Sequence, residues 1–145
     1  MEKGSYTLFL GLKEDQEINV GALGKKKFSE GFYAYNGSAL GKSGFSRIKR
    51  HKKLIKNGKT THWHIDYLLT NSKVNFVGLI KSTAEIECEL SQKPTNINRI
   101  DDFGCSDCKC GSHLLHSTDL KRLKREVLSV HKNHSEDVES EFEEK

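Results

Sequence analysis

The chain has 145 residues, of which 34% are hydrophobic and 30% are charged, and its formal net charge is +4. This length supports one domain rather than two, and no apolar run is long enough to cross a membrane as a helix. The first residues lack the apolar core and cleavage pattern of a secretory leader, so we expect a soluble, cytoplasmic protein that does not interact with membranes.

The first half of the chain predicts strands followed by a helix. Residues 5–12 are rich in β-forming residues and predict a strand, and the alternating, aromatic residues 30–37 predict a second strand that pairs antiparallel with the first. Between them, residues 17–28 are punctuated by glycine and fit either a short strand or a loop. A helix is predicted over about 45–57 and ends at Gly58.

The second half predicts three helices, one strand and two stretches without regular structure. Pro94 is the only proline in the chain and is expected to stop the second of these helices. In chain order, the elements are a helix in 62–71, a strand over 73–82, a helix over 84–93, an irregular stretch over 95–116, an amphipathic helix over 119–133 and a disordered acidic tail over 135–145.

The positive charge is concentrated in residues 42–59, which contain eight Lys or Arg and no acid. Such a local field attracts polyanions, of which nucleic acid is the usual one, although a solvated helix that keeps the protein soluble has the same composition. Gly37, without a side chain, is expected to let a substrate backbone approach closely. The candidate nucleic-acid-binding residues are Gly37, Ser38, Lys42, Lys49, Arg50, Lys52 and Lys53.

Short tyrosine and glycine motifs occur in a fixed order along the chain. Gly4-Ser5-Tyr6 begins the first predicted strand, Tyr35-Asn36-Gly37 ends the second, Arg47-x-x-Arg50-His51 lies in the next helix, and Glu87 lies in a later one. This order resembles the GIY-YIG nuclease superfamily. Together with His62–Tyr67, Glu87–Leu90 and Phe103–His113, it is similar to a mainly archaeal branch of Uri-type endonucleases.

The resemblance implies a metal-dependent endonuclease and gives a role to each matching residue. It implies that Tyr6, with Tyr35 beside it, activates or orients water, that Arg47 contacts phosphate oxygens, and that Glu87 holds Mg²⁺ or Mn²⁺. Taken singly, each residue type is also typical of packing or of a solvated surface, and Glu85 and Glu89 compete with Glu87. The candidate catalytic residues are Tyr6, Tyr35, Arg47, His51, His62 and Glu87, the two histidines being candidates for proton transfer.

Three of the four cysteines lie within six residues and are expected to be thiols or metal ligands rather than disulfides. Cys105, Cys108, Cys110 and His113 offer three sulfurs and an imidazole, the donor types of a structural Zn²⁺ site. Cys88 is an alternative ligand. The other interpretation is that these cysteines only pack, because structural zinc sites normally have two separated pairs of ligands.

The sequence therefore predicts a small α+β domain, with a three-stranded, mostly antiparallel sheet flanked by helices in the manner of GIY-YIG nucleases. Residues 1–118 form the predicted nuclease domain, 119–134 a C-terminal helix and 135–145 the tail. The expected function is hydrolysis of phosphodiester bonds in nucleic acid, with DNA the expected partner. The alternative is a non-catalytic nucleic-acid-binding module, with or without zinc. Because phosphate contacts carry no sequence information and nothing after residue 118 indicates a DNA-reading module, we expect specificity to come either from the structure of the nucleic acid or from a protein partner.

Overall fold

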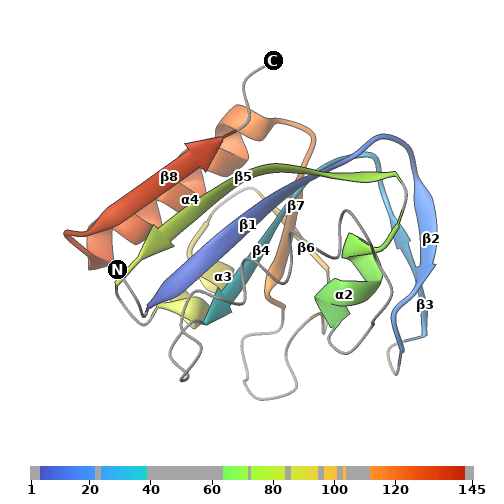
Figure 1. Ribbon diagram of the computed structural model, residues 1–145, viewed down its shortest axis with the longest axis horizontal. Helices are drawn as coiled ribbons and strands as arrows, with labels where there is room; N and C mark the ends of the chain where they lie inside the picture. The colour runs from blue at the N-terminus through green and yellow to red at the C-terminus, as the bar shows by residue number, and fades with distance from the viewer. Residues whose placement is uncertain are drawn as a thin grey trace.

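The computed structural model describes residues 4–21, 24–38, 64–71, 73–83, 86–94, 97–100, 103 and 112–142. These residues form strands and helices that are mixed along the chain (Figure 1). In chain order they are β1 (Ser5–Leu12), β2 (Gln16–Asn19), β3 (Lys25–Phe28), β4 (Gly31–Ser38), α2 (His64–Leu69), β5 (Val74–Ser82), α3 (Glu87–Gln92), β6 (Asn98–Arg99), β7 (Leu114–Ser117), α4 (Leu120–His134) and β8 (Val138–Phe142).

The main sheet has six strands in the order β6-β7-β4-β1-β5-β8, and every neighbouring pair is antiparallel. The strands β2 and β3 pair with each other as a separate two-stranded sheet. The strand β1 lies inside the main sheet between β4 and β5, and all eight of its residues are buried.

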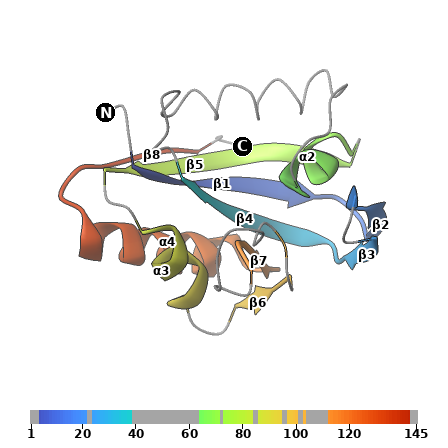
Figure 2. The same ribbon diagram turned by 90° about the horizontal axis from the view of Figure 1, so that it is seen from below.

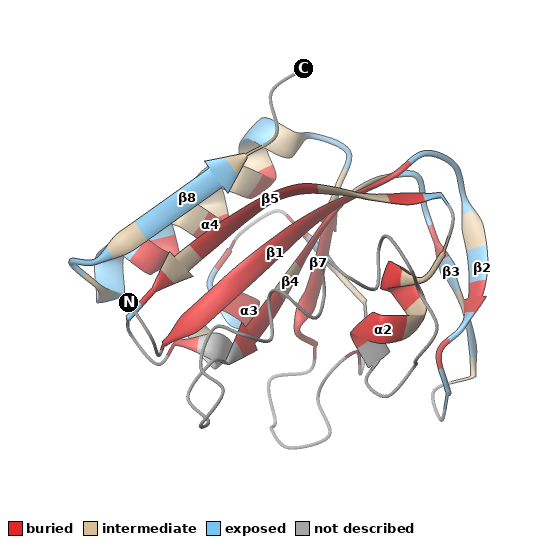
Figure 3. Cartoon of the chain, in the orientation of Figure 1, coloured by how far each residue is buried: buried red, intermediate tan, exposed pale blue. Residues whose placement is uncertain are grey.

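The main sheet is covered on both faces, with α2 on one face and α3 and α4 on the other (Figure 2). Because successive side chains of a strand point to opposite faces, β1 contributes to two cores. Leu8 packs in a cluster with Ile65 of α2, whereas Phe9 packs in a cluster with Leu90 of α3 and Val127 of α4. Burial is concentrated in the central strands, while β2, β3 and β8 carry most of the exposed strand residues (Figure 3).

Most predicted elements in the described residues are confirmed. The strands β1, β4 and β5 match their predicted ranges, and β4 pairs antiparallel with β1 as expected. The sequence of residues 17–28 fits either a short strand or a loop, and most of its described residues belong to the strand pair β2 and β3, which begins at Gln16. The helix predicted over 45–57 lies outside the described residues.

The C-terminal helix is also confirmed, as α4. Its first turn is capped by Asp119, whose side chain accepts a hydrogen bond from the backbone N–H of Arg122 at 3.2 Å. Among the helices that the structure describes, none has the length and apolar character needed to cross a bilayer.

The prediction of a three-stranded sheet is wrong, because β6, β7 and β8 extend it to six strands. The strands β6 and β7 come from residues 95–116, where the sequence indicated irregular structure. They have two and four residues, too few to show a period, and their pairing is decided by the neighbouring strand rather than by their own propensity.

The strand β8 corrects the prediction that residues 135–145 are disordered. Phe142 lies opposite Gly78 in the register and contacts the ring of Phe9, with 5.0 Å between the ring centroids. Glu139 forms an ion pair with Lys81 at 3.4 Å. The acidic composition of the tail indicated disorder, but Val138 and Phe142 give one face of the strand an apolar contact with the core.

Candidate active site

Tyr6 and Tyr35 lie on the same face of two paired strands. In the register of β1 and β4, Tyr6 is opposite Gly37 and Leu8 is opposite Tyr35, so both tyrosines and Gly37 point away from α3 and α4. The tyrosines pack in one cluster with Leu79. Tyr6 is nearly fully buried, with 2% of its surface exposed, whereas Tyr35 is half-buried. The structure thus brings together the two tyrosines that the sequence predicted as neighbours.

Gly37 makes room for the ring of Tyr6. A Cβ atom built at Gly37 would lie 2.5 Å from the Tyr6 Oη and would also collide with the ring carbons. Gly37 is itself buried. We predicted that this glycine allows close approach of a substrate, but in the structure the space above it is occupied by the Tyr6 side chain.

Tyr33 lies on the same face of β4 but deeper in the core. Its Oη donates a hydrogen bond to the backbone carbonyl of Ser29 at 2.6 Å. Burial, together with the nearby negative charge of Asp15, raises the pKa of Tyr33 above its ordinary value. A raised pKa leaves little of the phenolate form that could accept a proton from water, so Tyr33 is not a candidate for activating water.

The basic stretch 42–59 and the helix α3 both follow strands that end at the same end of the main sheet. Ser5 of β1 is opposite both Ser38, the last residue of β4, and Ser82, the last residue of β5. The basic stretch 42–59 follows β4 in the sequence, and α3 follows β5.

The helix α3 is fastened to this end of the sheet. The backbone N–H of Ile86 donates to Ser5 Oγ at 2.9 Å, and Glu87 is the first residue of α3. Ile86 and Leu90 pack in the core on the face opposite Tyr6. Glu87 therefore lies at the same end of the sheet as Tyr6. Its helix α3, however, packs against the face of the sheet opposite Tyr6.

Several candidate residues lie outside what the structure describes. For Ser38 in β4 and Glu87 in α3, the structure describes the backbone but not the side chain. The candidates outside the described residues are Arg47, His51, His62, Lys42, Lys49, Arg50, Lys52, Lys53, Cys105, Cys108 and Cys110.

A chain of buried polar side chains runs behind the tyrosines, on the face covered by α3 and α4. Thr7, the residue after Tyr6, donates from its Oγ1 to Asn36 Oδ1 at 2.8 Å, and it lies 2.9 Å from His131 Nε2. On the other side of the imidazole, His131 Nδ1 lies 2.7 Å from Ser82 Oγ. Asn36 Nδ2 donates to Ser91 Oγ of α3 at 3.5 Å. We call these five residues the buried polar chain; it links α4 and α3 to the three central strands.

The hydrogen-bond directions fix the protonation of His131. A hydroxyl has one proton, and that of Thr7 is donated to Asn36, so Thr7 must accept from His131 Nε2–H. His131 Nδ1 is then the acceptor for the hydroxyl proton of Ser82. Burial lowers the pKa of His131 to about 4, which keeps the ring neutral, as this arrangement requires.

Among Cys105, Cys108, Cys110 and His113, only His113 falls within the described residues, and the alternative ligand Cys88 is placed by the backbone of α3 alone. His113 is buried, and burial lowers its pKa below the ordinary value, so its imidazole is in the neutral form that can bind a metal. Its backbone N–H donates to the carbonyl of Phe103 at 2.8 Å, and its own carbonyl accepts from the N–H of Asn36 at 2.9 Å. Within the described part of the chain, no three His, Cys, Asp or Glu side chains gather closely enough to hold a metal ion.

Sequence reasoning missed His131 and Arg99. Arg99 donates to four backbone carbonyls, those of Ser91, Gln92, Pro94 and Ile97, at 2.6–3.2 Å, and so ties the end of α3 to β6. His131 lies next to Val130 on the buried side of α4. Its position beside the apolar stripe of the predicted helix was the signal in the sequence that could have indicated a buried histidine. No signal in the sequence distinguished Arg99 from a surface cation.

Residues 5–136 match the model of a protein family described as domain of unknown function DUF123. Searches of the curated proteins and of the solved structures found no similar protein.

Proposed function

The chain belongs to the family described as domain of unknown function DUF123, and from its own residues we propose that it is a metal-dependent endonuclease acting on nucleic acid, with DNA as the expected substrate. The observation that carries the proposal is the position of Tyr6 and Tyr35. They share one face at the end of the sheet where β4 leads to the basic stretch 42–59 and where α3 begins at Glu87. The ordered motifs that resemble GIY-YIG nucleases start from this same end.

In the proposed reaction, the oxygen of a water molecule attacks the phosphorus atom and the bond from phosphorus to the leaving sugar oxygen breaks. Tyr6 orients the water or accepts its proton, which requires positive charge nearby because an ordinary tyrosine has a pKa near 10. Arg47 provides that charge and contacts the phosphate oxygens. His51 and His62 are the proposed donors of a proton to the leaving oxygen.

The carboxylate of Glu87 is the proposed ligand for Mg²⁺ or Mn²⁺. One protein carboxylate suits Mg²⁺, which keeps most of its water ligands and is often completed by substrate phosphates. When bound, the ion would supply Lewis-acid stabilisation of the phosphate. The basic stretch 42–59 would hold the substrate backbone, with a protein partner supplying specificity, and we propose that the protein acts in the cytoplasm.

A second candidate function is supported by two features of the fold. Tyr6 is only 2% exposed, and α3 packs on the face opposite Tyr6. Both fit a module that binds nucleic acid on the same scaffold without cleaving it.

Cleavage assays distinguish the two functions. Purified protein would be incubated with labelled branched, single-stranded and double-stranded DNA and RNA, in Mg²⁺, Mn²⁺ or EDTA. The proposal expects metal-dependent cuts that disappear in Glu87→Gln and persist in Glu89→Gln, a matched change two residues along the same helix. Cuts that persist in Glu87→Gln would contradict the assigned ligand. Salt-sensitive binding without cuts in the parent protein would support the binding module.

A further inference from the structure

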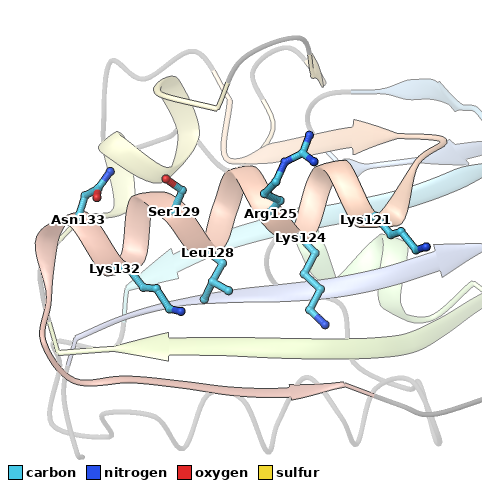
Figure 4. Close-up of a pocket in the computed structure, with 7 residues that line it drawn as sticks. All are labelled: Lys121, Lys124, Arg125, Leu128, Ser129, Lys132 and Asn133. Atoms are coloured by element: carbon cyan, nitrogen blue, oxygen red, sulfur yellow. The ribbon is translucent and has the colours of Figure 1, made fainter.

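The outer surface of α4 carries a row of cations that neither the tyrosine site nor the basic stretch 42–59 accounts for. Lys121, Lys124, Arg125 and Lys132 line a shallow groove along this helix (Figure 4). Among the described residues, no ion pair involves any of these four side chains, and no acid lines the groove. We call this surface the α4 groove.

The α4 groove has an apolar floor and small polar side chains beside the cations. Leu128, half-buried against the core, lies between them, and Ser129 and Asn133 complete the lining. Figure 4 shows Arg125, Ser129 and Asn133 on one side of the helix and Lys124, Leu128 and Lys132 on the other. Lysine, arginine, serine and asparagine are the side chains that commonly contact phosphate oxygens and sugars in nucleic-acid complexes.

One cation of the groove is held in place by the last strand. The Nζ of Lys124 lies 4.0 Å from the ring centroid of Phe142, in a cation–π contact. The edge strand β8 thus positions a charge of the groove as well as extending the sheet.

The length of the groove matches several phosphates of a nucleic-acid strand. From Lys121 to Lys132 the helix rises by roughly 16 Å, at 1.5 Å per residue. One strand of a duplex presents a phosphate about every 3.4 Å along its axis, so the cations would face about five phosphates.

We propose that the α4 groove is a second surface for the nucleic-acid backbone, separate from the tyrosine site. Because α4 covers the face of the sheet opposite Tyr6 and Tyr35, one straight duplex does not reach both surfaces (Figure 2). The substrate that uses both is bent or branched, with one arm on each face. This inference rests on the proposed function, since it names the shape of nucleic acid that the same protein recognises.

The test measures how salt affects binding of the full chain to a labelled branched DNA, in EDTA so that no cleavage occurs. The α4 variant carries Lys121→Ala, Lys124→Ala, Arg125→Ala and Lys132→Ala. The charge-matched control carries Lys13→Ala, Lys26→Ala, Lys27→Ala and Lys93→Ala, which lie outside the groove. A third variant, Lys121→Arg with Lys124→Arg and Lys132→Arg, keeps the charge.

Each phosphate contact contributes about 0.9 to the slope of log affinity against log salt concentration. With four contacts removed, the α4 variant is expected to lower this slope by about 3.6 relative to the control, while the arginine variant keeps it. On a straight duplex of the same length, the difference between the α4 variant and the control should be smaller. Thermal unfolding of all variants checks that each is folded.

Three outcomes would overturn the inference. The α4 variant and its control could have equal slopes on branched DNA, or the effect could be the same on straight and branched DNA. The groove could also bind vesicles of anionic lipid in place of nucleic acid. If the parent protein binds and cleaves DNA while the α4 variant equals the control, the second surface alone is wrong; if the parent does not bind any nucleic acid, the proposed function is wrong as well.

Discussion

One face of β1 and β4 carries Tyr6 and Tyr35, with Tyr33 deeper in the core, and the other face carries Thr7 and Asn36, with Ser5 at the end of the strand. These are neighbours in the sequence that point in opposite directions. The tyrosine face meets mostly apolar partners, whereas Thr7 and Asn36 belong to the buried polar chain that reaches α3 and α4.

Two consecutive residues of β1 can therefore have different roles. Tyr6 faces the proposed active site, whereas Thr7 packs among the polar side chains that hold the strand in place. Because Thr7 and Tyr6 share a backbone, a shift of Thr7 also moves Tyr6. The buried polar chain therefore affects both the stability of the protein and the position of the tyrosine rings.

The largest effect is expected from His131→Ala. The change removes the partner of both Thr7 and Ser82 and leaves a cavity in the second core, so we expect a loss of about 4 kcal/mol in the free energy of unfolding, measured with urea. Lys132→Ala, at an exposed position of the same helix, is the control and should change it by less than about 0.5 kcal/mol. Equal losses in the two variants would show that the buried polar chain adds nothing to stability.

The pH dependence of unfolding is the next largest effect. The pKa of His131 is about 4 in the folded protein and 6.5 ordinarily, so below pH 6.5 the unfolded chain binds the proton more readily and the folded state loses stability. The contribution lost between pH 6.5 and 4 is about 3 kcal/mol. Burial of His113 acts in the same direction.

Urea unfolding at several pH values measures this effect in the parent, in His131→Gln and in Asn133→Gln. The His131→Gln variant should have a shallower dependence than the parent, since its amide does not titrate, whereas Asn133→Gln, a neutral change on the same helix, should keep the parent slope. Parallel curves for all three proteins would contradict the assigned protonation of His131.

On the tyrosine face, Gly37→Ala should destabilise the protein by about 2 kcal/mol, because the new methyl group collides with the buried ring of Tyr6. Gly11→Ala on β1 is the matched control. A Cβ atom at Gly11 would lie 3.0 Å from Oδ1 of Asn75, a side chain that can move aside. In a Tyr6→Leu background the cost of Gly37→Ala should shrink, and thermal unfolding of the double mutant measures this. A cost that stays unchanged would mean that the Tyr6 ring is not the obstacle.

The sequence was informative wherever a segment of eight or more residues had a clear composition or period. The strands β1 and β5 are runs of β-forming residues, β4 alternates, and α4 has a helical period. The pairing of β1 with β4 places Tyr6 beside Gly37, as the motifs suggested. It failed for β6, β7 and β8, which are short and are stabilised by neighbouring strands and by single contacts such as that of Phe142 with Gly78. The buried polar chain joins residues up to 124 positions apart, so local patterns carry no trace of it.

The smallest effect is expected at the far end of the buried polar chain. Ser91 Oγ accepts from Asn36 Nδ2 at 3.5 Å, near the limit of a hydrogen bond, whereas Ser82 Oγ donates to His131 at 2.7 Å. Ser91→Ala should therefore cost less than about 1 kcal/mol and Ser82→Ala about 2 kcal/mol in the free energy of unfolding. If Ser91→Ala costs more than Ser82→Ala, the strands that carry the tyrosines are held in place mainly by α3 rather than by α4. Glu87, the first residue of α3, would then be coupled to Tyr6 through Ser91 and Asn36, and Ser91→Ala should lower cleavage more than Ser82→Ala does.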